Sequence, residues 1–265
     1  MIKKVKEIIQ SENDIYFLEV VSSKIVINNN YKGVFVLNQE LEILKEVDIF
    51  DDIMIYSCYI NELSEELLLF CPENECLVYV SLGTYEWKVI DLCEDLTNAV
   101  FSQAYMWNMN GLILSTYNGD FYSICIEKGS ISLIAGDIVS KKYMSFYKFW
   151  IEVKKHKIIS TRSNCFQFLF RSEQKDYYLC DLTHNSTYKI NYLPSMAHEI
   201  TFNRDMFAFI CEESISIVKQ NVNIARIEVG KEYELLKMKF LNNRVVVLHS
   251  SKLNPSNSFI TVYET

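Results

Sequence analysis

Short runs of alternating apolar and polar residues, separated by polar turns, recur along the chain. Residues 25–47 show the pattern: a β-branched run, a polar turn around residues 28–33, a second alternating run, a turn near residues 38–40 and a third run. A period of two with many β-branched residues predicts half-buried β-strands rather than helices. Five further stretches have the same form. We therefore expect six units of antiparallel strands joined by short turns.

The third strands of the units are expected at residues 33–38, 76–81, 120–126, 176–182, 214–219 and 258–264. Spread over 265 residues, six units give a period of about 44 residues, the length of a four-stranded propeller blade. The sixth unit ends after its third strand, whereas residues 3–9 have the alternation of a fourth strand. We expect this N-terminal strand to pair with the last unit and to remove its exposed edge.

This period and this closure resemble the β-propeller superfamily over the whole chain. No specific family signature accompanies them, neither Gly-His with Trp-Asp pairs nor a kelch double glycine. The resemblance implies an all-β fold, a six-bladed β-propeller of four-stranded antiparallel blades closed by the N-terminal strand, in a single domain over residues 1–265. Seven blades are the alternative, because residues 143–153 are aromatic and strand-like and lengthen the fourth unit. That segment is either an innermost strand before a long excursion or an insertion on the outside.

The sequence contains none of the motifs that signal catalysis or phosphate binding: no GxSxG, no P-loop and no GxGxxG. Its four histidines are far apart, and its 8 cysteines include no CxxC pair. Cys71 and Cys76 are the closest two and have no His or Cys neighbours to complete a zinc site. We expect no catalytic residue, no metal and no cofactor, and we expect the cysteines to be buried free thiols in a reducing cytoplasm.

The N-terminus lacks the apolar run and cleavage site of a signal peptide, and no apolar run approaches the ~20 residues that span a bilayer. A membrane is therefore not an expected partner. The net charge is −8 at pH 7, and a net anion repels phosphate backbones, which argues against nucleic acid as a partner.

The loops of a propeller divide between two faces, and the acidic residues concentrate on one of them. Loops from a fourth strand to the next blade share a face with turns between second and third strands. These two sets hold nearly half of the 34 acidic residues, Asp14 among them, and few lysines. Aromatic residues near the same mouth, such as Tyr31 and Phe101, are able to anchor a contact. The expected partner-binding residues are Asp48, Asp51, Asp52, Glu73, Glu75, Glu94, Asp95, Glu212 and Glu213.

Three hypotheses for function follow. In the first, the acidic loop face binds a basic protein and, where that protein is a toxin, neutralises it; an acidic chain without catalytic motifs resembles in character the immunity proteins of bacterial toxin systems. In the second, a hydrolase or lactonase acts on a small ligand in the propeller channel, although the innermost strands look mostly apolar and aromatic. In the third, the protein is a scaffold subunit of a larger assembly. We favour the first.

Overall fold

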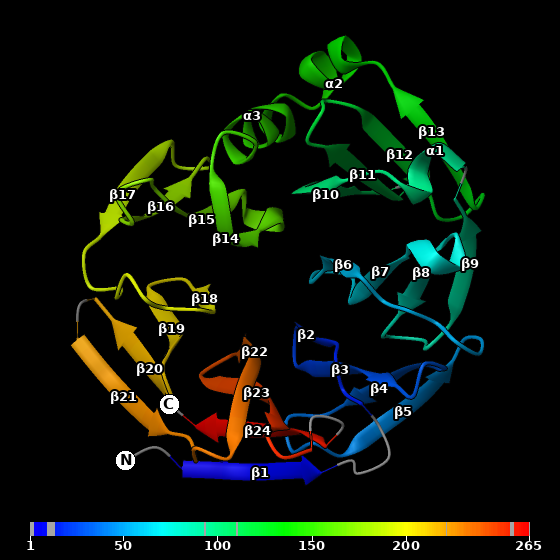
Figure 1. Ribbon diagram of the computed structural model, residues 1–265. Helices are drawn as coiled ribbons and strands as arrows, with labels where there is room; N and C mark the ends of the chain where they lie inside the picture. Colours follow the sequence, from blue (N-terminus) through cyan, green and yellow to red (C-terminus); the bar gives the residue numbers. More distant parts are fainter. Residues whose placement is uncertain are drawn as a thin grey trace. The chain divides into compact units, whose positions relative to one another are not determined.

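The alternating runs form strands in the computed structural model, which describes residues 3–9, 14–92, 94–109, 111–220, 222–254 and 257–264. For residues 3–9, 94 and 95 only the backbone is described. In these residues the strands form six antiparallel sheets of four strands each (Figure 1). Contacts divide the sheets into two sets of three that are consecutive along the propeller, residues 56–191 and residues 1–55 with 192–265.

The set formed by residues 1–55 and 192–265 begins with a sheet of β2 (Leu18–Val21), β3 (Lys24–Asn29), β4 (Gly33–Leu37) and β5 (Ile43–Asp48). A second sheet contains β18 (Ile200–Asn203), β19 (Met206–Cys211), β20 (Ser214–Lys219) and β21 (Val222–Glu228). The third contains β22 (Tyr233–Leu241), β23 (Arg244–Ser251) and β24 (Ser258–Glu264), and its fourth strand is β1 (Lys3–Ile9). β1 pairs with β24 from Lys3 opposite Glu264 to Ile9 opposite Phe259, so the predicted closure of the last blade is confirmed.

The set formed by residues 56–191 begins with β6 (Ser57–Asn61), β7 (Glu66–Cys71), β8 (Cys76–Ser81) and β9 (Trp87–Asp91). Its next sheet contains β10 (Phe101–Asn108), β11 (Gly111–Thr116), β12 (Phe121–Cys125) and β13 (Ser130–Ile134). Its last sheet contains β14 (Lys157–Arg162), β15 (Gln167–Arg171), β16 (Tyr177–Asp181) and β17 (Ser186–Ile190). Short helices lie between strands: α1 (Glu94–Thr97), α2 (Gly136–Lys142), α3 (Met144–Val153) and the 3₁₀ turns η1 (Pro72–Asn74) and η2 (Ser163–Cys165).

Of the two alternatives for residues 143–153, the innermost strand is wrong. Instead of a strand, residues 144–153 form helix α3, which packs on β10, and the first strand of the fourth sheet is β14. The buried residues of α3 are Phe146, Phe149, Trp150 and Val153. Their spacing of three, one and three residues is that of one helix face. The aromatic side chains suggested a strand, but their period is helical.

Apolar residues of neighbouring sheets pack together and form the core of each set. Ile25 and Ile27 of β3 pack with Val246 and Leu248 of β23 in one cluster, and Ala208 and Ile217 pack with Val245 and Val247 in the next. In residues 56–191, Leu68 and Leu77 pack with Leu112 and Ile124, while α3 fills the space beside β11, β12 and β15. Successive residues of β23 thus point to opposite faces of its sheet and pack in two different clusters.

Two glycines mark positions where strands approach closely. Gly33 begins β4 and Gly111 begins β11, both with positive φ. A Cβ at Gly33 would collide with the carbonyl of Val47, and one at Gly111 with the carbonyl of Ile124. Glycine is therefore required where these strands start.

The protein is a six-bladed β-propeller of four-stranded antiparallel blades. The seven-bladed alternative is wrong, because the additional residues of the fourth unit form α2 and α3 and not a further sheet. The expectation of a single domain stays a prediction. In the part of the chain that the structure describes, no helix combines the length and the apolar character that a bilayer crossing requires.

Candidate functional site

The turns after second strands and the loops after fourth strands meet at the same edge of their sheet. The amide of Ile49 donates to the carbonyl of Lys32 at 2.8 Å, so the β5–β6 loop is joined to the β3–β4 turn. The same bond recurs from Leu92 to Glu75 and from Val229 to Glu213, each at 2.8 Å. In these three sheets, the loop after the fourth strand therefore lies beside the turn between the second and third strands, as the sequence pattern predicts.

The best-defined group of acidic loops contains Asp14, Asp48, Asp51 and Asp52 together with Tyr16 and Tyr31, and we call it the aspartate loop cluster. Its first segment is fixed by Asn28, a fully buried residue of β3. The Asn28 side-chain oxygen accepts from the amides of Tyr16 and Phe17, both at 3.0 Å, and its Nδ2 donates to the Asp14 carbonyl at 2.8 Å. One buried amide thus sets the course of the chain that carries Asp14.

Two tyrosines connect this segment to the loop that carries Asp51 and Asp52. The rings of Tyr16 and Tyr31 stack with centroids 5.4 Å apart. The Tyr16 hydroxyl donates to the carbonyl of Ile53 at 3.3 Å and accepts from the amide of Ile55 at 3.2 Å. The amide of Ile53 donates to the Tyr31 carbonyl at 2.8 Å. These hydrogen bonds therefore fix the backbone that directly follows Asp51 and Asp52 and join it to the β3–β4 turn.

The carboxylates of this cluster reach solvent. Asp14, Asp48, Asp51 and Asp52 are all exposed. The Tyr31 hydroxyl donates to Asp14 Oδ2 at 3.4 Å, and partial burial together with the Asp14 carboxylate raises the pKa of Tyr31. Asn29 Nδ2 donates to Glu46 Oε1 at 2.7 Å and to Asp48 Oδ1 at 3.3 Å. The cluster therefore presents several oriented negative charges close to aromatic rings.

The other predicted acidic residues of residues 1–55 and 192–265 are in a more neutral setting. Glu212, at positive φ, and Glu213 form the β19–β20 turn. Glu213 Oε1 lies 3.6 Å from Lys252 Nζ, and the Lys252 amide donates to the Glu232 carbonyl at 2.9 Å. Lys252 offsets one of these two glutamates, as Lys32 offsets one of the four aspartates, so this turn carries less net negative charge than the aspartate loop cluster.

In residues 56–191, Glu73 and Glu75 lie in and just after η1, in the β7–β8 turn, and both are exposed. The hydroxyl of Tyr56, which is exposed, donates to Glu73, and this bond raises the pKa of Tyr56. Glu94 and Asp95 begin α1, and their side chains lie outside the described residues. The nine predicted residues thus belong to several loops, of which Asp48, Asp51 and Asp52 come together in one cluster.

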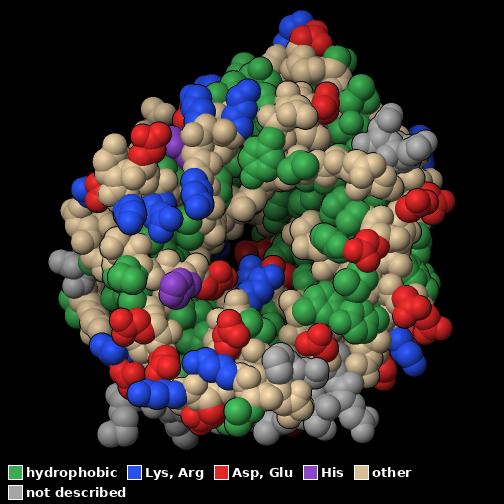
Figure 2. Space-filling model, viewed as in Figure 1, with side chains coloured by type: hydrophobic (Ala, Val, Ile, Leu, Met, Phe, Trp, Pro, Cys, Tyr) green, Lys and Arg blue, Asp and Glu red, His purple; other side chains and the backbone are tan. Residues whose placement is uncertain are grey.

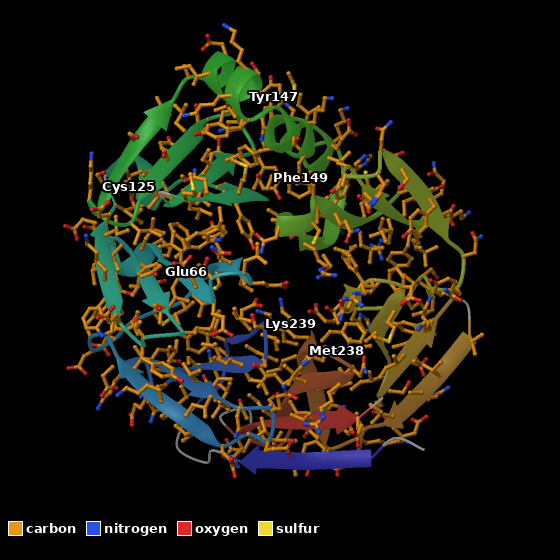
Figure 3. The ribbon with its side chains drawn as sticks, turned by 180° about the vertical axis from the view of Figure 1, so that it is seen from behind. Glu66, Cys125, Tyr147, Phe149, Met238 and Lys239 are labelled. Carbon is orange, nitrogen blue, oxygen red and sulfur yellow. The ribbon has the colours of Figure 1, made fainter. Side chains whose placement is uncertain are left out.

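A second charged group, which the sequence analysis missed, lies on first strands. Glu19 of β2 is 7% exposed, and its carboxylate lies 2.9 Å from Lys239 Nζ and 3.5 Å from Lys237 Nζ. We call these three residues, together with Glu199 directly before β18, the first-strand ion cluster. Figure 2 shows basic and acidic side chains together over β2 and β22. Met238, between the two lysines, is buried, so alternate residues of β22 face the core and the ion cluster (Figure 3).

The two glutamates of the first-strand ion cluster respond to it in opposite ways. Burial raises the pKa of Glu19, but Lys239 and then Lys237 outweigh this effect and hold the pKa below its usual value. Burial also raises the pKa of Glu199, and the same lysines do not compensate for it. Glu19 is therefore the member whose negative charge the fold stabilises. The alternation Lys-Met-Lys at residues 237–239 is the signal in the sequence, although it lies on an innermost strand, a class that looks mostly apolar.

The rings of His156, His184 and His249 contact other side chains of the fold. The ring of His156 stacks on Phe170 with centroids 3.9 Å apart, and that of His249 stacks on Phe259 at 4.8 Å. His184 Nδ1 lies 2.9 Å from Asp181 Oδ2. Among the residues with described side chains, no three His, Cys, Asp or Glu come together in an arrangement that suits a metal ion.

Comparison with known proteins identifies the fold and nothing narrower. No family model matches the sequence, and no curated protein matches it. Among solved structures, the chain is similar to the β-propeller domain of Cps50 (Swd1) from Myceliophteria thermophila, with a TM-score of 0.55, 10% identity and 100% of each chain covered. As many as 871 chains of solved structures match. A fold this widespread hosts many functions, so the chain is a β-propeller whose function must be argued from its own surface.

Proposed function

We propose that this protein is a non-enzymatic binding module that uses acidic loops to bind a basic protein partner and, where that partner is a toxin, to neutralise it. The β-propeller fold suggests a protein-interaction scaffold, and the aspartate loop cluster is the observation that carries the finer proposal. Its carboxylates are exposed, while the backbone beneath them is fixed by Asn28, Tyr16 and Tyr31. Fixed loops lose little conformational freedom on binding, which favours affinity.

Electrostatics determines which partner such a surface suits. Exposed carboxylates raise the rate of encounter with a cationic protein and disfavour an anionic one. The stacked rings of Tyr16 and Tyr31 lie next to Asp14, and an aromatic face beside carboxylates suits a lysine or arginine side chain. If the partner is a nuclease-like toxin, occupation of its phosphate-binding surface by these loops neutralises it as immunity proteins do.

The test compares two variants with equal changes in charge. Asp51→Asn/Asp52→Asn removes two charges from the aspartate loop cluster, and asparagine tolerates the positive φ of residue 52. Glu42→Gln/Glu127→Gln removes two exposed charges from turns between third and fourth strands, at the opposite edge of their sheets. A tagged protein is used to isolate partners from the native source at low and moderate salt, and the purified partner is then titrated by calorimetry.

We expect one basic partner, whose affinity falls about 2- to 30-fold in the Asp51/Asp52 variant, since each exposed pair contributes about 0.2–1 kcal/mol. The control variant should bind as the wild type does. Equal affinity of the wild type and the Asp51/Asp52 variant would contradict the proposal. Inhibition of the partner's activity at stoichiometric ratio tests neutralisation separately from binding.

The first-strand ion cluster favours a second candidate, a small-ligand site used by a hydrolase or lactonase. The Lys237 and Lys239 side chains are 32% and 30% exposed, so their ammonium groups are accessible from solvent. A ligand screen by thermal shift, with Lys239→Met as comparison, separates the two candidates. A stabilising small ligand that depends on Lys239, together with turnover, would favour the enzyme.

A further inference from the structure

Cys71 and Cys76 face each other across the β7–β8 hairpin. Cys71 ends β7, Cys76 begins β8, and the two are direct partners in the strand register. Directly opposite residues of antiparallel strands have Cα atoms about 4.5–5.5 Å apart and side chains on the same face, which is within the range that a disulfide spans. Both side chains are buried, at 0% and 2% exposure.

The turn between them holds this geometry. Residues 72–74 form η1, Glu75 adopts a left-handed conformation, and its amide donates to the Pro72 carbonyl at 3.0 Å. In the strand registers of the described residues, no other cysteine lies directly opposite a cysteine. Among the described cysteines, direct pairing across a hairpin is therefore specific to Cys71 and Cys76.

The two thiols also contact each other, and this contact shifts their pKa values in opposite directions. The Cys71 thiol donates a hydrogen bond to the Cys76 sulfur; this bond raises the pKa of Cys71 and lowers the pKa of Cys76. A thiolate is the form of cysteine that attacks oxidants. Cys58 of β6 lies opposite Leu69, two residues from Cys71 on the same face, and is partly exposed. The pair thus lies one strand away from a thiol that solvent reaches.

We propose that Cys71 and Cys76 are a reversible oxidation site, at which a hydroperoxide converts the two thiols into a disulfide across the β7–β8 hairpin. The Cys76 thiolate attacks one peroxide oxygen; the O–O bond breaks, and with hydrogen peroxide the leaving group is hydroxide, which takes up a proton to become water. The Cys71 thiol then attacks the sulfur of the Cys76 sulfenic acid, which releases a second water as the S–S bond forms. Two thiols are oxidised by two electrons in total, and one peroxide is reduced to two waters.

Oxidation would close the turn that carries Glu73 and Glu75. A disulfide between residues at either end of this turn restrains the loop in a way that the hydrogen bond from Glu75 to Pro72 alone does not. Tyr56, which donates to Glu73, connects that turn to the segment before β6. The site would therefore tie the redox state of the protein to the conformation of an exposed acidic turn, whether or not that turn binds a partner.

The test uses the reduced full chain treated with a small excess of hydrogen peroxide, quenched by thiol alkylation after denaturation. We expect the intact mass before alkylation to fall by about 2 Da and the alkylated thiols to fall from the 8 cysteines of the chain by two. Dithiothreitol should restore both. Cleavage after glutamate separates the three thiols into residues 47–62, 67–73 and 76–86, and the linked product should join 67–73 to 76–86.

The wild-type peptide map shows which cysteines are linked, so the proposal can be tested even if a variant fails to fold. A link that includes residues 47–62, or no link with all thiols alkylated, would overturn the proposal. Cys71→Ser and Cys76→Ser should each lose the 67–73 to 76–86 link, and the matched control Cys125→Ser should keep it. Far-UV circular dichroism establishes that each variant compared retains the fold.

Discussion

Replacing Glu19 with glutamine removes a negative charge from a position where it contacts two lysines and little water. The Glu19 side chain is 10% exposed, and its oxygens lie 2.9 and 3.5 Å from Lys239 and Lys237. Removing one partner of a buried ion pair costs about 3–5 kcal/mol, because the remaining charge stays buried without compensation. Both lysine side chains are about one-third exposed, so solvent recovers part of this cost. We expect Glu19→Gln to lower the free energy of unfolding by about 2–4 kcal/mol.

Urea unfolding at pH 7 measures this change as a shift of the midpoint, provided that the slope of the transition is unchanged. Glu42→Gln is the matched control, since Glu42 is exposed and such substitutions usually change stability by less than about 0.5 kcal/mol. A double-mutant cycle with Lys239→Met isolates the pair and should give a coupling of about 1–3 kcal/mol. A Glu19→Gln protein as stable as the control, or a coupling near zero, would refute the reasoning.

The pH dependence adds an independent check. The pKa of Glu19 is lowered in the folded state, so its contribution is fully present above the pKa of glutamate in the unfolded chain. It is lost as the pH falls through the lower pKa of the folded state. The difference in unfolding free energy between wild type and Glu19→Gln should therefore be constant near neutral pH and shrink under acid conditions. A difference that grows on acidification would contradict the assigned direction.

Three further predictions concern other parts of the structure. Burial raises the pKa of Glu199, so its ionised form lowers the stability of the protein above the folded-state pKa. In urea unfolding, Glu199→Gln should therefore be as stable as the wild type or up to about 1 kcal/mol more stable at pH 8, and any gain should disappear near pH 4. A clear loss of stability at pH 8 would count against this. Asn28→Ala removes three hydrogen bonds beneath Asp14 and should cost about 2–4 kcal/mol in the same assay, whereas a cost below about 1 kcal/mol would mean that the segment is held otherwise. Phe149→Ala in α3 empties a fully buried site and should cost about 3–5 kcal/mol, measured as a fall in the thermal midpoint; an unchanged midpoint would mean that α3 does not contribute to the core.

The blade architecture was predictable because every blade buries its strands between neighbouring sheets in the same way. In a strand packed on both faces, alternate residues point into two different cores: Val246 and Leu248 of β23 lie in one cluster, and Val245 and Val247 lie in the next. The chain closure was predictable for the same reason, since residues 3–9 alternate like a fourth strand and do pair with β24. α3 was not predicted because its aromatic residues individually favour strands, although the buried positions of that segment repeat with a helical period.

The sequence predicts some residues of the candidate sites and misses others. Asp48, Asp51 and Asp52 were found because acidic residues near each other in the chain stay near each other in a loop. Tyr16 was not found, because its role depends on Ile53 and Ile55, which lie far from it in the sequence. Contacts of this kind depend on strand register and loop course, which alternation alone does not specify.

We propose two roles for the acidic residues of this protein, and ionic strength should separate them. Glu19 is shielded from solvent and bonded to two lysines, so salt screens it weakly, whereas the exposed Asp51 and Asp52 are screened within about 10 Å at 0.1 M salt. Raising the salt concentration should therefore weaken binding of a basic partner while leaving the Glu19–Lys239 coupling nearly constant. If the partner affinity and the Glu19–Lys239 coupling fell together, the first-strand ion cluster would behave as a solvent-exposed ion pair. Its charges would then act together with those of the loops. If only binding fell, buried charges would hold the first strands together, and exposed charges would select the partner.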